Sequence, residues 1–206
     1  MRGNGEWRRN LWRFLVRNQR LLGLLLLFLI GVQAGCLVFR AAAHPLATAL
    51  DGLLSPSATA TGFAGVMQQM LTATAPNLLL LLLLFFLGFS ACGALPALMV
   101  PIFFGMGLGL SEAYYFAQGG WGVGFVALLV LPATMVATVA LLIAAAEATR
   151  LSACIGRQLL PHQSIGGGLW PDLKLYLARF LLCAGLLFAA GALDTVLRLC
   201  FMHHFV

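Results

Sequence analysis

The chain has 206 residues, of which 62% are apolar and 9% are charged, whereas soluble domains carry about 25% charged residues. A soluble fold with this composition would expose a large apolar surface, because it has too few charged residues to cover it. The composition therefore excludes a soluble domain and indicates that lipid surrounds the chain. The 12 basic and six acidic residues give a formal net charge of +6; because the basic residues flank apolar runs, they do not form the basic face that nucleic-acid binding requires.

Five apolar segments predict an all-α, polytopic membrane helix bundle in a single domain, 1–206. A bilayer core of roughly 30 Å requires about 20 apolar helical residues. The first segment has an apolar run of 19 residues, longer than the 7–15 residues of a cleaved signal peptide, and is expected to be an uncleaved anchor. The predicted transmembrane helices are 21–39, 77–94, 97–117, 133–154 and 175–193.

The fourth apolar stretch, Trp121–Ala146, leaves two alternatives open. It is longer than one span needs and contains Pro132, which lacks a backbone N–H and disfavours helix at Leu131. In one alternative, Gly122–Leu131 is a separate half-helix, re-entrant or interfacial, and the span begins near Ala133. In the other, the stretch is one tilted, kinked helix.

The basic residues predict the orientation of the chain. Six arginines lie in segment 1–20, and four further basic residues lie in or beside the loop 155–174. Cytoplasmic loops carry an excess of Lys and Arg. Placing both segments in the cytoplasm leaves only Arg40 and Arg198 outside. We therefore expect a cytoplasmic N-terminus and an extracytoplasmic C-terminus.

Amphipathic patterns outside the spans predict short interfacial helices. Segment 1–20 has a basic and an apolar stripe, which suits a helix along the cytoplasmic headgroups. The extracytoplasmic loop 40–76 contains two further patterns, expected to form two short helices on the outer leaflet. Their apolar faces are Leu46, Leu50, Leu53 and Leu54 in the first, and Phe63, Val66, Met67, Met70 and Leu71 in the second.

Residues with catalytic or ligand chemistry are few. The five cysteines have no paired spacing, the four histidines lack the spacing of a zinc motif, and no serine lies in a G-x-S-x-G setting. We therefore expect no catalytic residues, no enzyme activity, no cofactor and no metal. Glu112 and Glu147 lie near span ends. Asp194 and Arg198 are four residues apart and are expected to pair, either reaching for the interface or holding the bundle or a partner.

Glycines four residues apart predict close helix packing. Such pairs let two backbones approach each other in lipid, within one chain or between the chains of a homo-oligomer. There are three such pairs: Gly31 and Gly35, Gly105 and Gly109, and Gly120 and Gly124. The first two pairs, together with Pro132 and Asp194, are the candidates for helix packing or interaction with a partner.

Several short motifs, in this order, resemble the stage II sporulation protein M family. The resemblance covers the chain from about Leu21 to Phe205 and includes five spans with an outer loop after the first. The motifs are Leu87–Pro96, the glycine-rich third span, Gly120–Phe125 with Val130–Pro132, Ile155–Leu160 and Tyr176–Arg179.

The resemblance implies a multi-pass protein of the bacterial inner membrane that acts when the mother cell engulfs the forespore. In that role it would be a non-enzymatic scaffold for two peptidoglycan-degrading partners, stage II sporulation proteins D and P, during septal wall remodelling. Relatives in the wider family carry a histidine and a glutamate after the proline of the fourth span, and often a glutamate in the fifth. Here Ala133–Val136 has neither residue, and the fifth span has Asp194; this departure does not affect scaffolding.

If the chain is a scaffold, we expect the outer loop, Arg40–Pro76, and the outer helix ends to recruit the partners. One alternative is a small transporter or channel, which the proline-interrupted fourth segment and the glycine-rich third span would suit. A second alternative is a permease-like partner of a cytoplasmic ATPase, docking through Leu151–Lys174.

Overall fold

The computed structural model describes residues 18–41, 62–117, 130–158 and 169–201. Within these ranges the chain forms five helices, each long and apolar enough to cross a membrane. This confirms the predicted all-α bundle with five candidate spans. The helices are α2 (Gln19–Ala41), α4 (Gly62–Phe89), α5 (Ala94–Ala117), α7 (Leu131–Gln158) and α8 (Leu169–Phe201).

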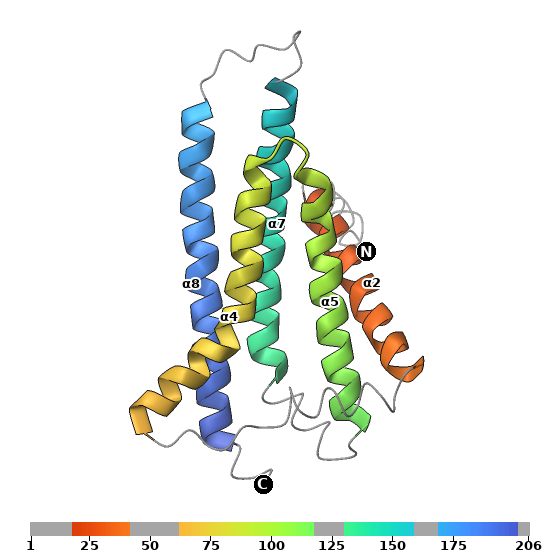
Figure 1. Ribbon diagram of the computed structural model, residues 1–206, viewed down its shortest axis with the longest axis vertical. Coiled ribbons are helices and arrows are strands. Elements are labelled where there is room, and N and C mark those ends of the chain that lie inside the picture. The colour runs from red at the N-terminus through yellow and green to blue at the C-terminus, as the bar shows by residue number, and fades with distance from the viewer. Residues whose placement is uncertain (1–17, 42–61, 118–129, 159–168, 202–206) are drawn as a thin grey trace, which may run out of the picture.

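The described basic residues gather toward one end of the bundle. Figure 1 shows that α2, α5 and α8 run in one direction and α4 and α7 in the other. The basic end therefore holds Gln19, the α4–α5 turn, Gln158 and Leu169. The distal end holds Ala41, Gly62, Ala117, Leu131 and Phe201. Toward the basic end lie Arg20, Arg150, Arg157, Lys174 and Arg179, whereas Arg40 and Arg198 lie at the distal end.

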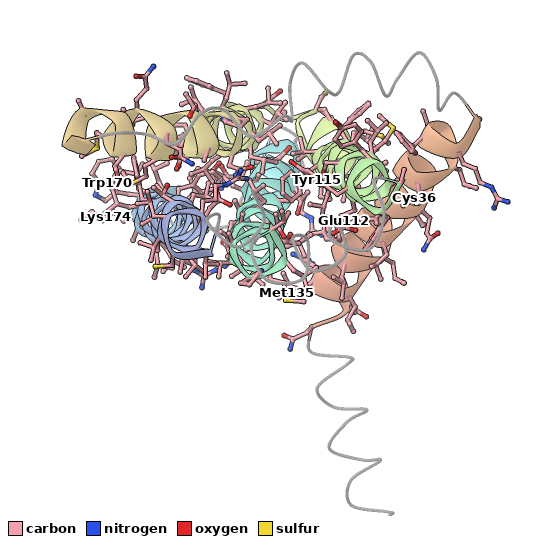
Figure 2. The ribbon with its side chains drawn as sticks, turned by 90° about the horizontal axis from the view of Figure 1, so that it is seen from below. Cys36, Glu112, Tyr115, Met135, Trp170 and Lys174 are labelled. Carbon is pink, nitrogen blue, oxygen red and sulfur yellow. The ribbon has the colours of Figure 1, made fainter. Side chains whose placement is uncertain are left out.

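Helix α7 is the centre of the bundle and packs against the other four helices. Seen along the bundle, it lies between α8 on one side and α5 with α2 on the other (Figure 2). Its buried surface consists largely of alanines, which permit close approach of helix backbones in lipid. The fully buried alanines of this helix are Ala140, Ala144, Ala145 and Ala148.

Helix α4 differs from the sequence prediction at its start. The loop 40–76 was expected to end at Pro76, but α4 begins at Gly62 and continues through this proline. Proline lacks the N–H that would bond to the carbonyl of Thr72, and this bends a helix. Figure 1 shows the bend, beyond which the first part of α4, residues 62–75, projects sideways from the bundle. We call residues 62–75 the arm.

The other helix ends also extend the predicted spans. The last span was expected at 175–193, but α8 has 33 residues, and α7 reaches Gln158 rather than 154. The connection between these two helices, expected at 155–174, is therefore shorter at both ends. Pro132 lies in the first turn of α7. The N–H groups of a first turn make no hydrogen bond within the helix, so a proline there costs no helical hydrogen bond. Several predicted features lie outside the described residues: residues 1–17 of the basic segment 1–20, the pattern 46–54, the pair Gly120 and Gly124, and residues 122–129 of the alternative half-helix Gly122–Leu131.

Candidate functional site

The four candidate glycines Gly31, Gly35, Gly105 and Gly109 meet at one interface, between α2 and α5. A methyl group on any of them would collide with a backbone carbonyl of the other helix. The carbonyls are those of Ile102 and Met106 for the glycines of α2, and those of Phe28 and Val32 for the glycines of α5. Gly31 meets Ile102 and Gly35 meets Met106, so residue numbers increase in the same direction along both helices, and the helices run parallel here. Such Cα–H to carbonyl contacts recur where glycines join helices.

Side chains on either side of the glycines complete the α2–α5 interface. Cys36 donates its thiol to the carbonyl of Gly109 across 3.4 Å. The rings of Phe28 and Phe104 stack with centroids 5.9 Å apart, and Phe39 packs edge-on against Tyr114. This interface is therefore held by direct backbone approach and short-range packing.

A second contact, between α4 and α8, is built on Tyr176. This side chain is only 2% exposed, and its hydroxyl donates to the carbonyl of Phe85 across 3.0 Å. Its ring lies among Phe85, Phe89 and Phe180, at centroid distances of 5.7, 5.7 and 4.4 Å. Gly88 provides the space for the hydroxyl, because a methyl group there would collide with it.

The turn between α4 and α5 is fixed from α7. Gly93 donates its N–H to the carbonyl of Ser90 across 3.0 Å, and a methyl group on Gly93 would collide with the carbonyl of Leu87. Ser152 is fully buried and donates its hydroxyl to the same Ser90 carbonyl across 2.6 Å. Ser152 thereby joins the basic ends of three helices.

Glu147 interacts with two of the described basic residues toward the basic end, Arg150 and Arg179. It pairs with Arg179 of α8 and lies 3.8 Å from the guanidinium of Arg150. Nearer the start of α8, the ammonium group of Lys174 lies over the ring of Trp170, 5.5 Å from the ring centroid. Figure 2 labels both residues. This cluster links α7 to α8 and leaves Arg150 and Arg179 exposed, as suits a surface beside anionic headgroups.

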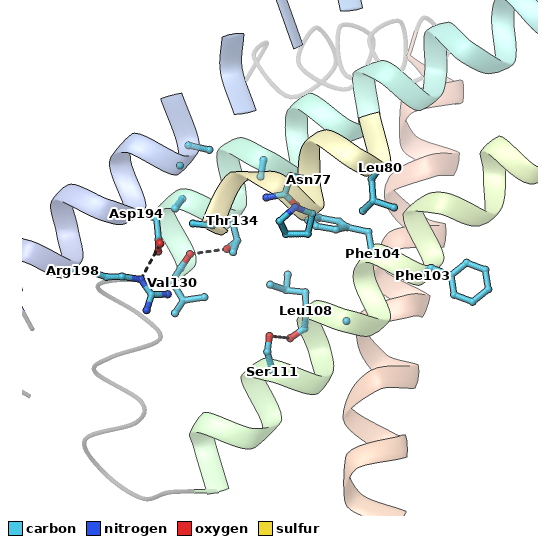
Figure 3. A pocket seen from close by; sticks show the side chains of 17 residues that line it. Asn77, Leu80, Phe103, Phe104, Leu108, Ser111, Val130, Thr134, Asp194 and Arg198 are labelled. Atoms are coloured by element: carbon cyan, nitrogen blue, oxygen red, sulfur yellow. Dashed lines mark hydrogen bonds and ion pairs between the residues drawn. The ribbon is translucent and has the colours of Figure 1, made fainter. Parts of the chain in front are cut away.

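A cavity of about 490 Å³ lies between α4, α5, α7 and α8 toward the distal end. Figure 3 shows the Asp194–Arg198 pair on its wall. Arg198 donates Nε–H to Oδ2 of Asp194 across 2.9 Å, so the pair expected from sequence is present. The two side chains are 23% and 14% exposed. The pair thus supplies the cavity with charges of both signs that cancel.

Three further polar residues line this cavity and were missed by the sequence analysis. Thr134 donates its hydroxyl to the carbonyl of Val130, and Ser111 to that of Leu108. Asn77 follows the proline of α4, and its amide makes no hydrogen bond with any described residue (Figure 3). The only sequence signal for Asn77 is its position between Pro76 and an apolar run, and this pattern predicts the start of a helix.

Comparisons with known proteins identify no family. No family model, no curated protein and no solved structure matches the chain. Within the described ranges, no group of three or more His, Cys, Asp or Glu side chains is placed to hold a metal ion. The resemblance to the stage II sporulation protein M family thus has its support in the sequence motifs alone.

Proposed function

We propose that the chain is a non-enzymatic scaffold of the bacterial inner membrane that recruits peptidoglycan-degrading partners during septal wall remodelling in endospore formation. The partners are stage II sporulation proteins D and P, as the sequence resemblance implies. In this proposal the basic end faces the cytoplasm, because Lys and Arg are enriched there. The distal end then faces the cell wall, where such partners act.

The arm is the observation that carries this proposal. It projects sideways from the bundle at the distal end (Figures 1 and 2). Met67 and Leu71 are exposed on it, one helical turn apart, with Gln68 also exposed. An apolar stripe beside polar groups at the membrane surface suits a partner that approaches from the wall side. Thr74, buried at the root of the arm, contacts Gly191 of α8 and ties the arm to the bundle.

Substituting the stripe tests the proposal without removing the arm. In the double variant Met67→Gln with Leu71→Gln, we expect partner recovery in affinity purification to fall at least about tenfold, the equivalent of about 1.4 kcal/mol. The matched control is Leu131→Gln with Met135→Gln, because these residues are also an exposed Leu and Met four apart at the distal end, but on α7. Unchanged recovery with the arm variant, or equal loss with both variants, contradicts a role for the arm.

A small transporter is the second candidate, and the cavity is the observation that favours it. Polar side chains in a partly open cavity between candidate membrane helices are typical of solute sites in transporters. Purified protein in liposomes separates the two candidates. The scaffold proposal expects vesicles as tight to ions and small solutes as empty ones, whereas robust flux that the Asp194→Asn variant abolishes would favour transport.

A further inference from the structure

We propose that the cavity between α4, α5, α7 and α8 binds one zwitterionic glycerophospholipid from the leaflet at the distal end. An acyl chain fills the apolar part of the cavity, and the phosphate and ammonium groups lie on Arg198 and Asp194. The cavity adjoins the root of the arm, because Ala73 lines it, but the exposed stripe of Met67 and Leu71 does not line it. The proposal adds a ligand to a protein whose proposed function requires none.

The apolar part of the cavity has the size and access that an acyl chain requires. About 490 Å³ is within the range of ligand pockets, roughly 300–1,000 Å³. Leu80, Phe104 and Leu108 are among the apolar residues that line the cavity. At its rim, Phe103 is exposed, and a side chain added to Gly107 would meet nothing within 4 Å. The cavity thus opens on the side of the bundle that faces lipid.

The apolar surface around the opening of the cavity also favours lipid over a water-soluble ligand. The rim is flanked on α4 and α5 by exposed apolar side chains, among them Leu79 and Phe103. Hydrocarbon is the solvent of such a surface, and the apolar part of the cavity does not hold water well. An acyl chain entering from the side exchanges one apolar environment for another and gains the packing contacts of the cavity wall.

The polar groups of the cavity determine which headgroup it suits. The carboxylate of Asp194 and the guanidinium of Arg198 offer opposite charges one helical turn apart on α8. A phosphate and an ammonium group carry the complementary pair of charges, whereas an anionic headgroup would have its negative charge opposed by Asp194. Asn77 adds an amide that can donate to an ester carbonyl or a phosphate oxygen.

The depth of these groups agrees with the same headgroup. Asp194 lies seven residues before Phe201, the last residue of α8, which is about 10 Å along a helix. Arg198 lies one turn nearer that end. The ion pair is therefore near the boundary between acyl chains and headgroups, and the cavity extends from it toward the bilayer centre.

Native mass spectrometry of the purified full chain tests this proposal. The protein in mild detergent receives equal amounts of phosphatidylethanolamine and phosphatidylglycerol with identical acyl chains. We expect one phosphatidylethanolamine per chain to be retained preferentially. Gly107→Leu should lower retention at least tenfold by obstructing the rim of the cavity. The control Gly185→Leu should leave it unchanged, because Gly185 is an open, exposed glycine of α8 that does not line the cavity.

Asp194→Asn tests the headgroup assignment. Removing the negative charge should shift the ratio of retained lipids toward phosphatidylglycerol by about tenfold. The melting temperatures of all variants show that they are folded; if Asp194→Asn fails to fold, Gly107→Leu decides alone. Three results would overturn the proposal: equal lipid retention by Gly107→Leu and Gly185→Leu, no headgroup preference in the wild type, or no lipid retained.

Discussion

Replacing Gly35 by leucine is expected to separate α2 from α5 and to lower the stability of the protein strongly. The new side chain would begin inside the backbone of α5, at the carbonyl of Met106 and the N–H of Leu110. Backbone atoms of a helix cannot move aside singly, so the two helices must part. We expect a loss of about 3 kcal/mol in the free energy of unfolding, the upper end for overpacked sites. This corresponds to a melting temperature about 6–12 °C lower.

Gly23 provides the control on the same helix. Its added side chain would meet nothing within 4 Å, so Gly23→Leu should stay within about 2 °C of the wild type. Labelling of Cys36 with a maleimide, in a background with the other four cysteines replaced by alanine, reports the interface directly. Cys36 is half-buried against Gly109, and Gly35→Leu should accelerate its labelling. Equal melting temperatures for the two leucine variants contradict the glycine contact.

Replacing Tyr176 by alanine is expected to have the second large effect. The side chain fills a space between α4 and α8 among three phenylalanine rings and is only 2% exposed. Truncating such an aromatic residue leaves a cavity that rigid helices cannot close, and costs about 3 kcal/mol or more. A thermal melt in detergent measures the loss.

Two variants separate the parts of this effect. Tyr176→Phe keeps the ring and removes only the hydroxyl, which donates to the carbonyls of Phe85 and, over a longer distance, Leu84, so it should cost about 1 kcal/mol. Phe188→Ala makes a comparable truncation on the same helix where the side chain is 43% exposed. Lipid or detergent fills that space, so we expect little change. If Phe188→Ala lowers the stability as much as Tyr176→Ala does, the aromatic cluster around Tyr176 does not contribute more to stability than an exposed phenylalanine.

The number of spans could be predicted from sequence because the bilayer thickness sets the length of an apolar run. The ends of the helices could not, because a helix continues beyond the bilayer wherever its backbone is satisfied. Helix α4 shows this most clearly. Pro76 was interpreted as a boundary, yet the helix passes through it, since neighbouring helices and local adjustments compensate for a proline in a membrane helix.

The glycine spacing showed which face of α2 and α5 is bare but not which helix covers it. Pairing depends on contacts between residues about 70 positions apart, such as Gly31 and Ile102. Single polar residues gave even less signal. The hydroxyl of Ser152 finds its partner 62 residues away, and Asn77 belongs to no motif, so its place in the cavity follows only from the arrangement of four helices.

The scaffold role is tested most directly by affinity purification of the tagged chain from its own sporulating host, in mild detergent, with the eluate identified by mass spectrometry. We expect peptidoglycan-degrading proteins to co-elute with the wild type and to be lost with the double variant Met67→Gln with Leu71→Gln. Elution of the chain alone, or together with a cytoplasmic ATPase, would contradict it.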